Sequence, residues 1–253
     1  EIKDKEAVTK FLESVGQFAS ILNESGYLGL RQLTDEEITG TDTEAGIIEK
    51  YFSLSQTDTT TLEDITLKAD EMKIGDNHLC LHTLSDVEDL PGEVATDSRY
   101  EKLSTDRSDC RLSFAAPIGL LLPCNHIYNQ YVFIDDSAAN LQKFEKMAKN
   151  MHSLSRYSRS NQINKEWIDE YLNEAHSFGL TSVRCHCNVM AWSDDREELK
   201  RIRNEVGSQL AQMECKPRHN TVDTPTLFWA AIPGNAADFP VEESFYTFIV
   251  ANT

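Results

Sequence analysis

The stretch Thr181-Ser-Val-Arg-Cys-His-Cys-Asn-Val-Met-Ala-Trp192 has the residue pattern that decides the kind of fold this chain adopts. Every second residue from Val183 to Ala191 is an aliphatic residue or a cysteine, whereas the residues between them include Arg184 and Asn188. Side chains two residues apart in a β-strand lie on the same face. The alternation therefore predicts a strand that presents these two sets of side chains on opposite faces.

The residues after this strand predict a helix. Asp194 and Glu197 are spaced as in a capping box, in which two side chains satisfy free backbone N–H groups at the start of a helix. Apolar residues then recur every three or four positions from Leu199 to Met213, which places them on one helix face. A strand followed by an amphipathic helix is the first unit of the expected fold.

Similar patterns elsewhere in the chain predict three further helices and four further strands. The helices are expected over residues 4–22, 137–151 and 165–178, and the strands over residues 79–84, 111–122, 131–134 and 226–232. Polar residues at 53–64 and 153–164 predict loops. We therefore expect an α+β fold with helices packed on a mixed or antiparallel sheet. Residues 1–68 are expected to form an acidic, mainly helical part, and residues 69–253 an α+β domain.

The charge of the chain argues against nucleic acid as its main partner. The 253 residues have a net charge of −18, and residues 1–110 hold 25 Asp and Glu against 10 Lys and Arg. Nucleic-acid binding needs clustered cations that displace counterions from phosphates. The possible basic contact surface consists of Lys143, Lys146, Lys149, Arg156 and Arg159, with Arg196, Lys200, Arg201 and Arg203 on the later helix. Most clusters of this kind are solvated helix faces.

The sequence contains no pattern for a membrane span or a secretory signal. No run reaches the roughly 18 to 20 apolar residues that cross a bilayer. The first residues, Glu1-Ile-Lys-Asp-Lys-Glu6, lack the charged-then-apolar pattern of a signal peptide, and we expect the chain to be part of a longer protein. Six cysteines without a secretory context favour a reducing compartment.

Neither a nucleotide motif nor a complete set of metal ligands is present in the sequence. None of the eleven glycines is followed by lysine, which excludes a phosphate-binding P-loop, and no Gly-x-Gly-x-x-Gly occurs.

The possible metal ligands do not form a complete set. The strand alternation places His186 on the face opposite Cys185 and Cys187. His78 and His82 are expected to share a strand face with Cys80, but a tetrahedral site needs a fourth ligand. The acidic pairs 135–136 and 194–195 are expected to cap helices.

The sequence Ile232-Pro-Gly-Asn235 predicts a tight structural turn. Proline suits the second position of a type II turn, and Gly234 suits the third, where φ is positive. The residues Pro233, Gly234 and Asn235 are therefore expected to form a hinge after a buried strand rather than a ligand site.

The wider segment resembles a known family. Thr226-Leu-Phe-Trp-Ala-Ala-Ile-Pro-Gly-Asn235, followed by Phe245-Tyr-Thr-Phe248, is similar to the region just before the motor domain in the large conjugation ATPases of type IV secretion. The similarity is to the TraG proteins of conjugative transposons, which are related to the VirB and TrbE class. It extends over residues 110–253 and includes Tyr131-Val-Phe-Ile-Asp-Asp136, the helix with Trp167 and the strand from Val183 to Trp192.

This resemblance implies a non-catalytic docking and assembly region of an ATPase that powers conjugative DNA transfer. ATP and Mg²⁺ would bind in a RecA-like motor domain beyond residue 253, so no catalytic, cofactor-binding or metal-binding residue carries over to this chain. The implied partners are inner-membrane components of the secretion system and other copies of the full-length protein. The implied location is peripheral, at the cytoplasmic face of the inner membrane.

Two alternatives follow from the residues alone. The first is a small metal-dependent hydrolytic enzyme that uses His78, His82 and a carboxylate. The second is a module that binds single-stranded DNA along the basic helices, although Tyr157 is the one aromatic residue among those cations.

Overall fold

The chain folds into two compact units. The computed structural model describes residues 4–26, 29–54, 63–68, 71–91, 98–112 and 114–249. The described residues up to Tyr51 form the first unit, and Phe52–Leu54 together with the described residues from Glu63 onward form the second. Of the loop expected at 53–64, residues 55–62 lie outside the described residues.

The first unit is helical, as the sequence predicts. It contains α1 (Lys5–Glu24), α2 (Asp35–Thr39) and most of α3 (Ile47–Ser53). The side chain of Asp4 caps α1 by accepting hydrogen bonds from the backbone of Glu6 and Ala7, and a capping box formed by Thr34 and Glu37 begins α2. These caps explain why the helices begin where they do.

The second unit is built on an antiparallel sheet with β7 (Thr181–Ser193) at its centre. The main order is β1 (Ile65–Lys68), β2 (Glu71–Ile74), β3 (Asn77–Leu84), β7 and β6 (Asn125–Phe133). In addition, β8 (Arg218–Asn220) pairs with β3, and β9 (Phe245–Ile249) pairs with β7. All of these pairs are antiparallel, so the predicted α+β fold is confirmed. The strand β1 belongs to this sheet although it lies within the expected N-terminal part, residues 1–68.

Helix α7 (Arg196–Gln212) covers one face of β7. Its buried residues Ile202, Val206 and Leu210 pack with Cys187, Val189 and Ala191 of the strand, and α4 (Ala116–Leu121) adds the fully buried Ile118. The predicted stripe of apolar residues along this helix therefore faces the core. The N-cap is Asp195 and not Asp194, because the Asp195 carboxylate accepts hydrogen bonds from the backbone of Glu197 and Glu198.

The C-terminal segment covers the other face of β7. His186 is fully buried there, and its Nδ1 lies 3.0 Å from the carbonyl oxygen of Glu243. Phe239 stacks on Tyr131 of β6 with ring centroids 4.3 Å apart and also contacts the His186 ring. The strand is thus buried on both faces, and β3 and β6 pair with its two edges.

Two segments predicted as strands are mainly helical. Residues 226–232 lie largely in α8 (Thr224–Ala230). Of the described residues in 111–122, only β5 (Arg111–Leu112) is a strand, which pairs with β4 (Ser98–Arg99), whereas residues 116–121 form α4. In both helices a proline lies in the first turn, where its missing N–H is not needed. Ile118 of α4 and Leu227 and Phe228 of α8 are buried on these helices, and a short apolar run alone does not distinguish a helix from a strand.

The other boundaries differ less from the prediction. The helix expected over 137–151 is α5 (Ser137–Leu154), and that expected over 165–178 is α6 (Arg159–Phe178), which ends at Gly179 as its left-handed φ allows. The prediction of a loop at 153–164 is therefore mostly wrong. Capped by Ser158, α6 begins at Arg159, six residues before the expected start. The strands predicted at 79–84 and 131–134 are confirmed and begin earlier. Among the described residues, no helix is both long and apolar enough to cross a membrane.

The turn at residues 232–235 follows helix α8 rather than a strand. The backbone N–H of Asn235 donates to the Ile232 carbonyl over 2.8 Å, and Gly234 has a φ of +90°. The Asn235 side-chain amide also donates to the carbonyl of Trp229 over 3.0 Å, which ties the turn to the helix end. The backbone hydrogen bond from Asn235 to Ile232 and the positive φ of Gly234 are the features of a type II turn.

Replacement of Gly234 by valine is expected to lower the free energy of unfolding by about 1 to 3 kcal/mol, because a β-branched residue is strained at positive φ. No other atom lies within 4 Å of the added Cβ, so the loss would come from the backbone alone. Thermal melts of the unchanged chain and of Gly234→Val measure this loss of stability. Gly16→Val, in α1 and without a positive φ, is the control and should not lower the melting temperature. An unchanged melting temperature for Gly234→Val would contradict the strained turn.

Candidate functional site

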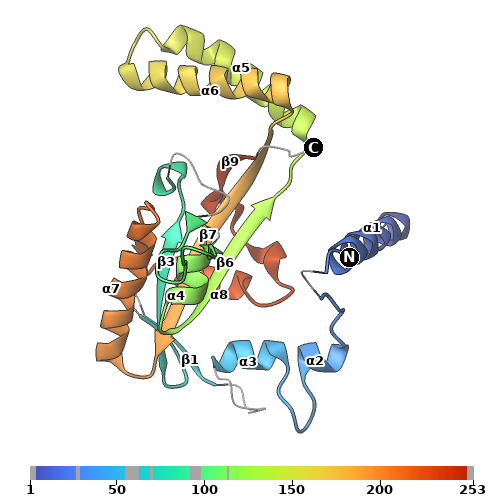
Figure 1. Ribbon diagram of the computed structural model, residues 1–253, viewed down its shortest axis with the longest axis vertical. Coiled ribbons are helices and arrows are strands. Elements are labelled where there is room, and N and C mark those ends of the chain that lie inside the picture. The colour runs from blue at the N-terminus through green and yellow to red at the C-terminus, as the bar shows by residue number, and fades with distance from the viewer. Residues whose placement is uncertain are drawn as a thin grey trace. The chain divides into compact units, whose positions relative to one another are not determined.

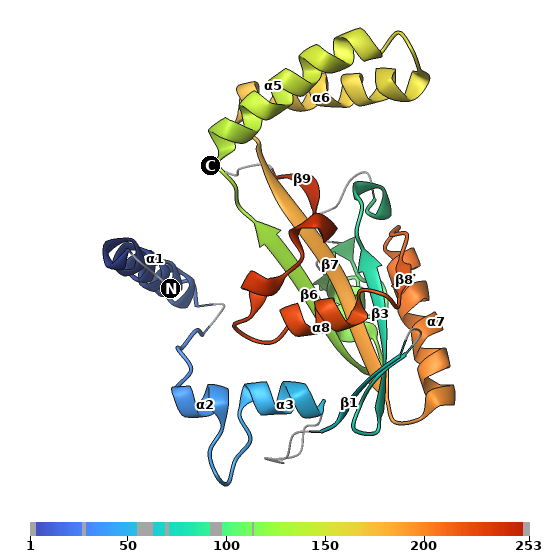
Figure 2. The same cartoon turned by 180° about the vertical axis from the view of Figure 1, so that it is seen from behind.

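A two-helix arm connects β6 to β7. These strands are antiparallel neighbours, and a pair of this kind needs only a tight turn between them. Instead, α5 and α6 leave the sheet together and extend beyond its end (Figure 1). The view from behind shows the same arrangement (Figure 2). Phe144 of α5 and Tyr171 of α6 are buried against each other, with ring centroids 5.0 Å apart.

The base of the arm is fixed to the sheet by polar contacts. Arg184 of β7 donates two hydrogen bonds to Asp135, over 2.8 and 3.1 Å, and lowers the pKa of that carboxyl group. Asp136 caps α5 by accepting from the backbone of Ala139. Of the predicted acidic caps 135–136, Asp136 therefore has that role, and Asp135 instead forms an ion pair with the strand.

The arm contains the first group of predicted basic residues. Lys143, Lys146, Lys149, Arg156 and Arg159 are all exposed on α5, on the first residue of α6 and between the two helices. Among the described residues, Lys146, Lys149 and Arg156 form no ion pair. The acidic residues Glu166, Asp169, Glu170 and Glu174 lie further along α6. The outer part of the arm is therefore basic in a chain whose net charge is −18.

The second group of predicted basic residues does not extend this surface. Arg196, Lys200, Arg201 and Arg203 lie on α7, which packs on the sheet face. Three of them have acidic partners: Arg196 lies 3.8 Å from Glu71, Lys200 lies 2.6 Å from Glu197, and Arg201 lies 3.0 Å from Glu198. Arg203 lines a separate pocket.

Exposed aromatic side chains also lie on the arm. Tyr157, between the two helices, is 82% exposed, and Trp167 of α6 is 58% exposed. Phe178, the last residue of α6, is exposed as well. These aromatic side chains are spread along the arm from its outer end to its base. Exposed aromatic residues are enriched at surfaces that contact other macromolecules.

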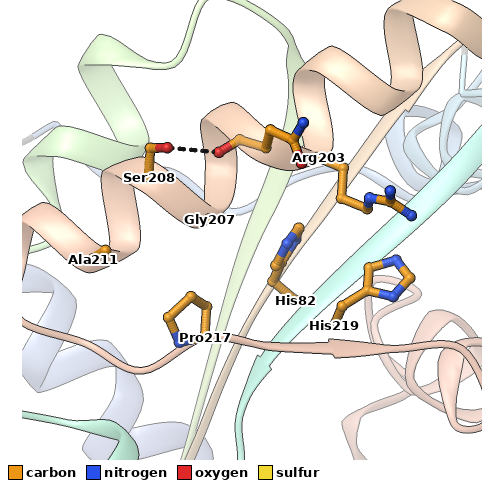
Figure 3. Close-up of a pocket in the computed structure, with 8 residues that line it drawn as sticks. His82, Arg203, Gly207, Ser208, Ala211, Pro217 and His219 are labelled. Carbon is orange, nitrogen blue, oxygen red and sulfur yellow. Dashed lines mark hydrogen bonds between the residues drawn. The ribbon is translucent and has the colours of Figure 1, made fainter.

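A pocket of about 640 Å³ lies between α7 and the edge of the sheet formed by β3 and β8. His82 of β3 and His219 of β8 are directly opposite in the antiparallel register, so both side chains lie on the face toward α7. Their ring centroids are 5.6 Å apart. Figure 3 shows the Arg203 side chain extending from α7 on the side of the His219 ring. Asn204, Gly207, Ser208, Ala211 and Pro217 complete the lining.

The pocket favours neutral histidine. Burial of His82, the proximity of His219 and the positive charge of Arg203 together lower the pKa of His82 to about 4. Burial and Arg203 also lower the pKa of His219. Both imidazoles are therefore uncharged at neutral pH, and Arg203 is the charged group of the pocket.

The structure does not bring together the histidines considered as metal ligands. His78 and His82 are four residues apart in one strand, which separates their Cα atoms by about 13 Å. The Nδ1 of His78 lies 2.8 Å from a carboxylate oxygen of Glu71, and His82 faces His219 and Arg203 instead. Cys185 and Cys187 lie on one face of β7 and His186 on the other, as predicted. No group of three or more possible metal ligands occurs within the residues that the structure describes.

Sequence reasoning missed the pairing of His82 with His219 and Arg203. These residues lie on three elements, and His82 is more than a hundred positions before the other two in the chain. No local pattern indicates that β8 pairs with β3, because β8 has only three residues. His82 itself was identified, but with the wrong neighbours.

The sequence was compared with known proteins. No family model matches the chain, and no curated protein matches it.

Proposed function

We propose that this chain is the non-catalytic docking and assembly region of a conjugation ATPase that powers DNA transfer through a type IV secretion system. In this proposal, the motor domain that binds ATP and Mg²⁺ follows residue 253 in the parent protein. The chain itself contacts inner-membrane secretion components and other copies of the parent at the cytoplasmic face of the inner membrane.

The α5–α6 arm is the observation that supports a docking role. A connection of two long helices between adjacent antiparallel strands is not needed to close the sheet. The outer residues of the arm, among them Lys146, Lys149 and Tyr157, are exposed and contribute little to the core. A projecting, basic surface with exposed aromatic residues suits contact with another macromolecule.

The proposal predicts that the isolated chain does not hydrolyse ATP. With ATP and Mg²⁺, phosphate release should stay at the level of a buffer control, because the sequence has no P-loop lysine to contact the terminal phosphates. The gene sequence downstream of codon 253 gives the complementary test. A Gly-x-x-x-x-Gly-Lys-Ser/Thr there would support the parentage, whereas sustained turnover by this chain would contradict it.

Binding of single-stranded DNA is the second candidate function, and the exposure of Tyr157 among the basic residues of the arm favours it. Bases stack on exposed aromatic rings, and cations contact the phosphates. In a titration with a fluorescent oligothymidine, this function requires an affinity that falls steeply with salt and is lost when Lys143, Lys146 and Lys149 are changed to glutamate. No binding at low salt would exclude it and leave protein docking as the role of the arm.

A further inference from the structure

The pocket beneath α7 has a charge opposite to that of the chain. Its eight lining residues include Arg203, His82 and His219 and no aspartate or glutamate. The chain as a whole has 42 acidic residues against 24 basic ones, so the charge of this lining is opposite to that of the chain. The side-chain amide of Asn204 and the hydroxyl group of Ser208 are the other polar groups of its lining.

His82 is buried at this pocket without a full set of hydrogen-bond partners. The residue is only 5% exposed, and its Nδ1 is buried with no hydrogen-bond partner among the described residues. Buried polar side chains nearly always have a partner. The Nδ1 atom is enclosed by protein atoms, whereas the Nε2 atom faces Gly207 of the pocket lining and is the ring nitrogen that a ligand can contact. The hydrophobic residues that surround His82 supply no hydrogen-bond partner, since Cys80 and Leu84 flank it on the same strand face.

Arg203 differs from its neighbours on α7. Arg196, Lys200 and Arg201 each have an acidic partner, whereas Arg203 forms no ion pair with any described residue. Its exposed side chain lies on the side of His219 in Figure 3, and its positive charge lowers the pKa of both histidines. A cation held next to two histidines opposes the binding of a metal ion and favours the binding of an anion.

Gly207 keeps the pocket open above His82. A Cβ atom added at this position would lie 3.8 Å from the Nε2 atom of His82, and no other atom would lie within 4 Å of it. A long side chain here would have room to extend into the pocket and fill it. The glycine thus leaves space on the inner side of α7 between Arg203 and Ala211.

We propose that this pocket binds the phosphate group of a small phosphorylated molecule, with Arg203, His82 and His219 as its ligands. The planar guanidinium group matches phosphate oxygens with two parallel hydrogen bonds, and each imidazole donates one N–H. The volume of about 640 Å³ exceeds that of phosphate alone and leaves room for an organic group beside Pro217 and Ala211. This inference is independent of the docking function of the arm.

The test is an NMR titration of the histidine side-chain resonances in the whole chain at constant ionic strength. Inorganic phosphate and glycerol 3-phosphate are the two probes, and chloride is the reference salt. We expect saturable shifts of the His82 and His219 resonances with both probes, with tighter binding of the phosphomonoester. If inorganic phosphate binds equally well, the organic part of the ligand is not recognised and the proposed phosphorylated molecule is excluded.

Matched variants identify the residues that bind. Arg203→Gln should weaken phosphate binding by about 10-fold or more, because the charge-assisted bonds are lost. Gly207→Leu should block the pocket without removing any of the proposed ligands. Arg201→Gln, on the same helix and paired with Glu198, should bind as the unchanged chain does. Equal losses in Arg201→Gln and Arg203→Gln, or shifts with Zn²⁺ but none with phosphate, would overturn the proposal.

Discussion

Replacement of the α5–α6 arm by a two-residue turn is expected to reduce conjugative transfer by about 100-fold or more, because a few residues of a docking surface supply most of its binding free energy. This expectation rests on the proposed function, in which the arm contacts another component of the secretion apparatus. The experiment uses the full-length parent protein in a donor strain that lacks its own copy of the gene. Transfer frequency is the measurement.

The register of the sheet dictates the design of this variant. Phe133 of β6 pairs with Arg184 of β7, so continuing the register places Asp136 opposite Thr181. Residues 137–180 are therefore replaced by Asn-Gly, the preferred sequence for a two-residue hairpin turn. The ion pair between Asp135 and Arg184 is retained. We expect the sheet to fold, because Phe144 and Tyr171 of the arm pack mainly against each other.

Two further proteins complete this experiment. Lys146→Glu with Lys149→Glu reverses the charge of the arm and should also lower transfer, by less than the deletion. Arg196→Gln with Lys200→Gln changes two cations that have acidic partners on or near α7, and should leave transfer unchanged. If the arm-deleted protein is folded by circular dichroism and still supports normal transfer, the docking role of the arm is wrong.

The centre of the fold could be predicted because its residues repeat with a clear period. The alternation from Val183 to Ala191 identifies β7, and the apolar stripe from Leu199 to Met213 identifies α7. The same alternation correctly predicts that Cys185 and Cys187 lie on one face of the strand and His186 on the other. These features depend on local spacing, which is fully visible in one chain.

The errors have a common physical cause. Around Pro117 and Pro225 the apolar runs are too short to show a period, and the proline in the first turn of each helix is the one local signal that favours a helix. The early start of α6 depends on a single capping serine, Ser158, in a stretch whose composition is typical of loops. The pocket could not be predicted at all, because only the pairing of β8 with β3 brings His219 to His82.

Acidification is expected to destabilise the protein through His82. The pKa of this histidine is about 4 in the folded protein and about 6.5 in an unfolded chain. Between these values the unfolded state binds more protons than the folded state, so the free energy of unfolding falls as the pH falls. The contribution of His82 to the free energy of unfolding is fully present above pH 6.5 and is lost progressively as the pH falls toward 4. A shift of this size corresponds to about 3 kcal/mol.

Urea unfolding at a series of pH values between 7.5 and 4 measures this loss. His82→Gln cannot titrate, so its stability should depend less on pH over this interval, whereas His152→Gln, exposed on the arm, should follow the unchanged chain. Burial is the first cause of the low pKa, and the positive charge of Arg203 adds to it. Arg203→Gln should therefore raise the pKa of His82, so that the total loss of stability on acidification is smaller and ends at a higher pH, without being abolished. Parallel pH profiles for the unchanged chain and His82→Gln would show that His82 is not buried as a neutral group.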